Sequence, residues 1–160
     1  MLDDVSELLL DRTRCSVAGT LAVVGEKWSL LVLREAFLGV RRFADFQRIL
    51  GAPRAVLTDR LATLVEQGIL RRVPYQAEGE RQRHEYRLTE KGIALYPTLV
   101  ALMEWGDRYL GDVGGAMELH HRDCGAPVHL TLTCEDGHIL SGAREVRPVP
   151  RIAGRAGRSA

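Results

Sequence analysis

Hydrophobic residues recur at helical spacing through the first two thirds of the chain, and glycines and prolines divide them into separate segments. The helices that this pattern predicts span residues 1–14, 16–24, 27–38, 43–50, 53–67 and 90–110. The segment 27–38 has so little polar surface that we expect it to be the central, buried helix. The amphipathic segment 1–14 is interpreted as an arm that precedes the main domain.

Two of these helices form a recognisable pair. Residues 43–50 and 53–67 are separated only by a short turn that contains Gly51, a spacing typical of a helix-turn-helix. We expect Pro53 in the first turn of the second helix, where its missing N–H costs nothing. Gly68 then fits a left-handed cap at the end of that helix.

A β-hairpin is predicted directly after the pair. Residues 69–75 and 84–88 have the composition of strands, Pro74 favours an edge position, and the polar loop 76–83 joins the strands. A hairpin in this place is a wing, so we predict a mainly α fold with a small β-wing, a winged helix-turn-helix. Thr89 is expected to cap the long helix that follows.

The rest of the chain differs in character. Residues 111–146 contain short β-like pieces around two turns and predict a small β-like, zinc-ribbon-like extension. Residues 147–160 are rich in Pro, Gly and Arg, and we expect them to be disordered. The predicted organisation is an N-terminal arm (1–14), a winged helix-turn-helix domain (15–110), the extension and a tail.

Composition excludes several classes of protein. The 160 residues are 46% hydrophobic and 27% charged, the balance of one ordinary globular domain. Charged residues interrupt even the apolar stretch 17–40, which therefore lacks the roughly 20 apolar residues of a membrane helix. The N-terminus is acidic, unlike a secretory signal, and the few scattered cysteines favour a reducing compartment. We predict a soluble, cytoplasmic protein with no membrane partner.

The net charge of +1 conceals a basic block. Residues 41–91 hold 11 basic and 7 acidic side chains, and 10 of the 11 are arginine, which suits phosphates and guanine edges. The residues expected to contact double-stranded DNA are Arg41, Arg42, Arg54, Ala55, Thr58, Asp59, Arg60, Arg81, Gln82 and Arg83. The alternative is an ordinary amphipathic surface with solvated arginines.

The faces of the helix 53–67 favour the DNA interpretation. One side carries the residues Leu57, Leu61, Leu64 and Val65. The opposite side is slim and carries Ala55, Thr58, Asp59 and Ala62. A slim face lets the backbone approach the floor of a major groove. Arg54, in the first turn, is placed to touch bases or phosphates, Arg60 to reach a phosphate, and the basic loop 76–83 to grip the backbone or the minor groove.

At the level of motifs, residues 15–110 resemble the HxlR family of winged helix-turn-helix transcriptional regulators. The matching segments are Cys15-Ser16-Val17-Ala18, Gly25-Glu26-Lys27-Trp28, Leu33-Arg34-Glu35, Arg42-Phe43-Ala44-Asp45-Phe46, Val56-Leu57-Thr58-Asp59-Arg60-Leu61, Leu64-Val65-Glu66-Gln67-Gly68-Ile69-Leu70, Tyr86-Arg87-Leu88-Thr89-Glu90-Lys91-Gly92 and Glu104-Trp105-Gly106. The resemblance implies a homodimer that binds an inverted-repeat operator and represses, or sometimes activates, nearby genes. Relatives usually have a polar residue where Ala55 stands, so base reading here falls on Arg54 and Thr58.

The resemblance also implies that the N-terminal segment and the long helix after the wing form the dimer. The apolar stripe of that helix is long for a small domain to cover alone: Leu95, Leu99, Leu102, Trp105 and Tyr109. The alternative is that these residues pack only within one protomer.

Cys15 is a candidate redox switch. It stands at the start of the helix 16–24, where the helix dipole favours a thiolate. In some members of the family a cysteine at the matching position senses oxidants or electrophiles. The alternative is a small buried residue. The other candidate signal is a small-molecule effector. Trp28, Phe37 and Trp105 are expected either to line a pocket for it or to form part of the core.

The extension carries candidate metal ligands beside two turn glycines. His121 and Cys124 form one pair, and Cys134 and His138 form the other. This layout is typical of a small zinc ribbon and predicts a four-ligand zinc site. The alternative is a hairpin that binds neither metal nor cofactor.

Enzymatic chemistry is not predicted. The sequence shows no nucleophile with a base, no paired carboxylates and no Gly-rich phosphate loop. The remaining alternative to a DNA-binding regulator is a protein-interaction module that uses a winged-helix scaffold without binding DNA.

Overall fold

The computed structural model describes residues 15–76, 82–110, 115 and 117–149. Contacts divide the chain into two units, residues 16–130 and residues 131–160 together with 1–15. The predicted arm and most of the predicted tail, residues 150–160, lie outside the described residues. Residues 117–130, which belong to the predicted extension, fall in the first unit.

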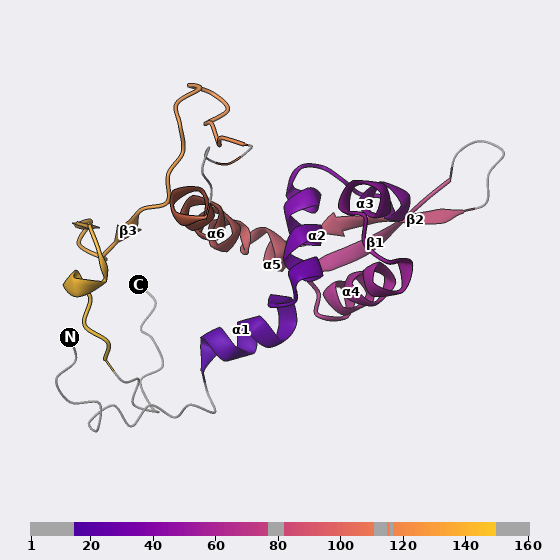
Figure 1. Cartoon of the computed structure of the whole chain (residues 1–160), viewed down its shortest axis with the longest axis horizontal. Helices are drawn as coiled ribbons and strands as arrows, with labels where there is room; N and C mark the ends of the chain where they lie inside the picture. The colour runs from indigo at the N-terminus through magenta and orange to yellow at the C-terminus, as the bar shows by residue number, and fades with distance from the viewer. Residues whose placement is uncertain (1–14, 77–81, 111–114, 116, 150–160) are drawn as a thin grey trace. The chain divides into compact units, whose positions relative to one another are not determined.

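Four helices open the first unit: α1 (Ser16–Val24), α2 (Lys27–Phe37), α3 (Phe43–Leu50) and α4 (Arg54–Glu66). The predicted bounds agree with them to within one residue at each end. α2 contacts α3, α4, the later helix α6 (Tyr96–Tyr109) and the strand β2 (Arg83–Leu88), which confirms its central place (Figure 1). Within the described part of the chain, no helix by itself is long and apolar enough to cross a membrane; α1 and α2, bent by 79°, pass that test as a pair, by length and composition.

The core of the first unit is mainly aliphatic. Its fully buried side chains are Phe46, Leu33, Leu57, Leu61, Leu64, Ile69, Leu70, Val32 and Ser29. α4 supplies Leu57, Leu61 and Leu64, each with no exposed surface. Since burying one leucine is worth about 1.5–3 kcal/mol, this row anchors α4 firmly against the body of the domain.

A left-handed glycine makes the turn between α3 and α4. Gly51 has a φ of 62°, and its N–H donates to the Gln47 carbonyl at 3.0 Å, which closes α3. Pro53 stands just before α4 and not in its first turn as predicted, because its ψ of 134° is extended. Its carbonyl nevertheless accepts the first helical hydrogen bond, from the Leu57 N–H at 3.0 Å. The predicted cap at Gly68 is confirmed by a φ of 67°.

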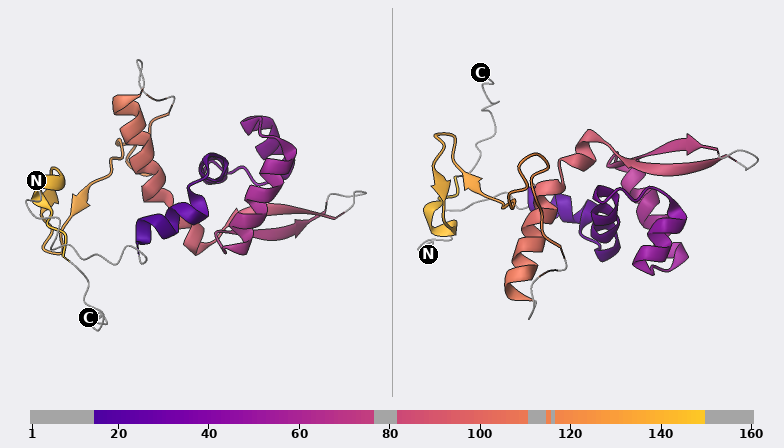
Figure 2. Two further views of the ribbon diagram at one scale, coloured as in Figure 1. Left: turned by 60° about the horizontal axis from the view of Figure 1, so that its bottom comes forward. Right: turned by 90° about the horizontal axis from the view of Figure 1, so that it is seen from above.

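The predicted wing is present as an antiparallel hairpin of β1 (Leu70–Tyr75) and β2 (Arg83–Leu88). Arg83 was predicted in the loop but is a strand residue, because it pairs with Tyr75. On the other side of β2, the Tyr86 N–H donates to the Arg41 carbonyl at 2.8 Å. The hairpin therefore holds the segment before α3, and its outer end extends beyond α3 and α4 (Figures 1 and 2).

The prediction of one long helix over residues 90–110 is wrong. The structure has a short α5 (Glu90–Ile93) and a separate α6 (Tyr96–Tyr109). Pro97 explains the break, because proline has no N–H to donate to the carbonyl four residues earlier and its ring clashes with that carbonyl. The predicted cap is confirmed: the Thr89 hydroxyl oxygen accepts a hydrogen bond from the Gly92 N–H at 3.1 Å.

Large apolar side chains are exposed on α1 and α6. On α6, Leu102, Trp105 and Tyr109 are 50%, 56% and 62% exposed. On α1, Val17 and Leu21 are exposed as well. By contrast, Leu95 and Leu99 of the predicted stripe pack against the core. The stripe is therefore part core and part surface.

The three aromatic residues predicted either to line a pocket or to form core have different surroundings. Trp28 packs against the core. The Phe37 ring lies against Tyr96, with ring centroids 4.8 Å apart, and Trp105 lies against Tyr109 at 5.6 Å. Trp28 thus belongs to the core, whereas Trp105 belongs to the exposed face of α6.

The second unit is small. Its strands β3 (Leu132–Thr133) and β4 (Ile139–Leu140) pair antiparallel, and a single 3₁₀ turn, η2 (Ala143–Glu145), follows. Over residues 131–149 no side chain is buried; Cys134 and Leu140 are half-buried and the others are exposed. This part of the chain therefore has a hairpin but no hydrophobic core of its own among these residues.

Candidate nucleic-acid interface

α4 presents a slim exposed face opposite its buried leucines. The exposed residues of this face are Ala55, Thr58, Asp59 and Ala62, as the sequence predicts. The Thr58 hydroxyl donates to the Arg54 carbonyl at 2.8 Å, which keeps that side chain close to the helix. The face is thus built from side chains no longer than an aspartate.

Arg54 opens α4 and is exposed. Its guanidinium carbon lies 5.1 Å from the centroid of the Phe43 ring, which begins α3. This cation–π contact crosses the turn and orients the guanidinium at the end of the slim face. From the sequence, Phe43 is named only within the segment 42–46 that resembles the HxlR family; the signal for this contact is an aromatic residue at the first position of α3.

Arg60 is placed differently from Arg54. It forms an ion pair with its neighbour Asp59, and its side chain is only 26% exposed. The pair partly neutralises both residues that sequence analysis assigned to DNA contact. Of the predicted cations on α4, Arg54 is therefore the better placed to bind an anion.

The segment before α3 carries two further arginines that are predicted to contact DNA. Arg41 and Arg42 are both exposed. The Arg42 guanidinium carbon lies 4.6 Å from the centroid of the Tyr75 ring, at the outer end of β1. Tyr75, which the sequence did not single out, thus links this segment to the wing.

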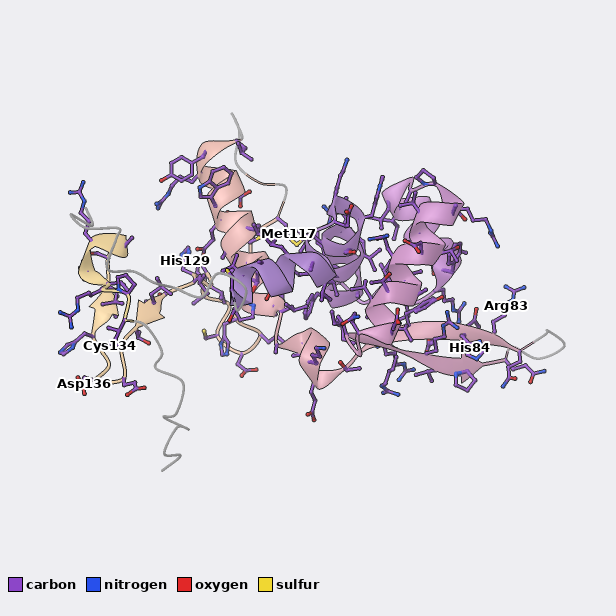
Figure 3. The ribbon with its side chains drawn as sticks, turned by 90° about the horizontal axis from the view of Figure 1, so that it is seen from below. Arg83, His84, Met117, His129, Cys134 and Asp136 are labelled. Carbon is purple, nitrogen blue, oxygen red and sulfur yellow. The ribbon has the colours of Figure 1, made fainter. Side chains whose placement is uncertain are left out.

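The wing carries the remaining predicted contacts. Gln82 and Arg83 are exposed, and Arg81 lies outside the described residues. Figure 3 shows Arg83 and His84 near the outer end of the hairpin, away from the helices. Together, the start of α4, the segment before α3 and the end of the hairpin offer cationic side chains on three separate elements.

Cys15 directly precedes α1 and is exposed. The interpretation of this residue as a small buried side chain is therefore wrong for the chain as described. Its exposure leaves the thiol accessible to a small oxidant.

The predicted metal ligands occur in two local pairs. His121 Nδ1 lies 3.2 Å from Cys124 Sγ in the first unit, and Cys134 Sγ lies 3.4 Å from His138 Nδ1 in the second. Next to the first pair, the Gly125 carbonyl and then the Glu118 carboxylate accept hydrogen bonds from His120 and raise its pKa. The four-ligand zinc site stays a prediction.

The helix pair, the hairpin and the slim exposed helix face define a winged helix-turn-helix domain. Comparison with known proteins identifies its family: the chain belongs to the HxlR-like helix-turn-helix family, which matches residues 23–113. The resemblance found in the sequence is confirmed. The protein is a helix-turn-helix transcriptional regulator, and its family and relatives are regulators rather than enzymes.

Two similar proteins cover most of the chain. The uncharacterized HTH-type transcriptional regulator Rv3095 of Mycobacterium tuberculosis is 48% identical over 136 residues, which are 84% of this chain and 85% of the relative. The crystal structure of PA1607, described as a candidate transcription factor, has a TM-score of 0.75 and 41% identity, and the match covers 86% of this chain and 96% of that one.

A third similar protein is the redox regulator HypR in its oxidized form. It has a TM-score of 0.55 and 35% identity, and the match covers 62% of this chain and all, 100%, of HypR.

Proposed function

We propose that this regulator represses transcription as a homodimer that occupies an inverted-repeat operator in double-stranded DNA. The face of α4 opposite its leucines enters the major groove, and the wing lies on the backbone or in the minor groove. One observation carries the proposal: Leu57, Leu61 and Leu64 are fully buried, whereas the opposite face is slim, exposed and headed by Arg54.

Some side chains of the proposed interface suit contacts with bases, and others suit contacts with phosphates. A guanidinium at the start of a recognition helix can donate two hydrogen bonds to one guanine, and Arg54 occupies that position. Ala55 offers only a methyl group, which suits a thymine methyl. Arg42 and Arg83 lie outside α4 and are assigned to phosphates, which position the protein without reading sequence.

A homodimer accounts for the exposed apolar faces of α1 and α6. Leu102, Trp105 and Tyr109 are each at least half exposed, which is costly for a protomer that stays alone in water. We propose that a second copy covers them. In such a dimer the two copies of α4 lie about 34 Å apart, one turn of DNA, and this spacing explains an operator with two-fold symmetry.

Oxidation of Cys15 is the proposed signal. Its thiol is exposed at the start of α1, and HypR, which is similar in structure, is a redox regulator. Peroxide would oxidise the Cys15 thiol to a sulfenic acid and be reduced to water or an alcohol, whereas diamide would join the Cys15 thiols of two protomers in a disulfide and be reduced to its hydrazine. Either change at the edge of the proposed dimer interface would alter that interface and release the operator.

The binding of duplex DNA at several salt concentrations tests the function. A dimer that makes about seven phosphate contacts is expected to lose affinity with a log–log slope of about −6. A protein-interaction module would show no such affinity for promoter fragments from its own genome or for any other duplex, and that result would overturn the proposal.

A pair of matched variants locates the interface. Ala55→Glu adds a carboxylate to the exposed slim face and is expected to lower the affinity at least about tenfold, because like charges at an interface cost several kcal/mol. The control is Ala143→Glu, which makes the same change at an exposed position of η2 and should leave the affinity unchanged. Equal effects of the two variants on the affinity would contradict the placement of α4 in the major groove.

A further inference from the structure

We propose that the turn between β3 and β4 binds a divalent transition metal, most readily Zn²⁺, through Cys134, Asp136 and His138. One ligand atom from each of these side chains can be chosen so that all three atoms lie within 4.8 Å of one another. Figure 3 shows Cys134 and Asp136 close together on this turn. Cys134 and His138 are ligands predicted from the sequence, whereas Asp136 is not.

The backbone of the turn holds these donors together without a metal. The Gly137 N–H donates to the Cys134 carbonyl at 3.0 Å, and the Cys134 N–H donates to the His138 carbonyl at 3.1 Å. Gly137 has a φ of 81°, in the left-handed region that favours glycine. The turn is thus closed by its own hydrogen bonds, and an ion would meet donors that are already near one another.

The donor set selects the kind of ion. A thiolate, an imidazole and a carboxylate are the ligand types that Zn²⁺ takes in proteins, whereas Mg²⁺ and Ca²⁺ require oxygen donors. Zinc is usually tetrahedral, so three ligands leave one position for water or for another side chain.

A bound metal ion would stabilise the second unit. None of its side chains in the range 131–149 is buried, and its strands have two residues each. A hairpin of this length gains little stability from apolar burial, and small units of this kind are commonly stabilised by a metal. A site at the turn would lie directly between the two strands that it has to hold.

Cobalt provides the spectroscopic probe. The full chain is stripped of metal with a chelator and titrated with Co²⁺, which gives a thiolate-to-cobalt charge-transfer band when a cysteine binds. Cys134→Ser is expected to abolish this band, and Asp136→Asn and His138→Gln are expected to weaken binding about tenfold or more. Matched controls that leave the site intact are Cys15→Ser, Glu135→Gln and His129→Gln.

A second measurement needs no variant. Zn²⁺ is expected to slow the alkylation of Cys134 by iodoacetamide, measured peptide by peptide, and to leave the alkylation of Cys15 unchanged. Protection of Cys134 together with loss of the band in Cys134→Ser supports the site. A band that survives in Cys134→Ser, or a wild-type chain that shows neither band nor protection, overturns it, whatever the outcome of the DNA-binding experiments.

Discussion

The Arg54 guanidinium carbon lies 5.1 Å from the centroid of the Phe43 ring, across the turn that joins α3 to α4. The contact joins the first residues of the two helices of the helix-turn-helix. An arginine held in this way loses less side-chain entropy when it binds than a freely moving one. It also gives the proposed base-reading residue a defined position relative to the groove.

Arg54→Ala is expected to relax sequence preference. The variant should lose affinity for the operator by about 1–3 kcal/mol and change little on random DNA, because a guanidinium that reads a base contributes only at its own sequence. Competition binding with operator and random duplexes measures the difference. Phe43→Leu, which keeps an apolar residue but removes the ring, should give a smaller loss of the same kind. Equal losses on both duplexes would contradict a base-reading role.

Arg83→Ala is expected to weaken binding to every duplex alike. An arginine that neutralises a phosphate carries no sequence information, so its removal should flatten the salt slope by about 1 for each phosphate that it neutralised. The measurement is the affinity for operator and random DNA over a range of salt concentrations. Arg144→Ala, an arginine of the second unit, is the control and should leave the slope unchanged. A weakening confined to the operator would instead make Arg83 a base-reading residue.

Trp105→Glu is expected to separate the proposed dimer. The wild-type chain should sediment at twice 17.8 kDa at micromolar concentration, and the variant at 17.8 kDa, because a carboxylate would be buried in the interface. Val149→Glu makes the same kind of change at an exposed apolar position of the second unit and should stay dimeric. A wild-type chain that sediments as a single protomer would contradict the dimer itself.

Leu61→Ala is expected to destabilise the first unit by about 2–5 kcal/mol, since it removes a fully buried side chain and leaves a cavity. Urea unfolding followed by tryptophan fluorescence measures the change. The neighbouring Ala62 is exposed, so Ala62→Ser should change stability by no more than about 0.5 kcal/mol. Similar effects at the two positions would mean that the leucine face of α4 is not its anchor.

Cys15→Ser is expected to make operator binding insensitive to peroxide or diamide while leaving the affinity under reducing conditions unchanged. The variant removes the only exposed thiol placed next to α1 among the residues described. The release of DNA is followed by fluorescence anisotropy during oxidation, with Cys124→Ser as the control. If wild type and Cys15→Ser release DNA alike, Cys15 is not the sensor.

Local sequence accounts for most of the elements because their signals act over one or two turns. Gly51 and Gly68 mark helix ends through a backbone conformation that other residues disfavour, and both have positive φ values in the structure. The same kind of local signal corrects the one large error. Pro97 interrupts the helix predicted over residues 90–110, and a stricter use of the proline rule would have placed the break.

The amino-acid order alone determined the helix-turn-helix, the wing and which face of α4 is apolar, since these follow from spacing within each segment. Tertiary structure decided which side chains from different segments meet and which charged groups are buried. It placed Arg54 on Phe43 and Arg42 on Tyr75, and it buried the Glu35 carboxylate 2.5 Å from the Arg34 guanidinium. Within one turn, the backbone conformation around Gly137 added Asp136 to Cys134 and His138. Contacts between segments depend on how the backbone folds in space, and the hydrophobic pattern of any one segment does not contain that information.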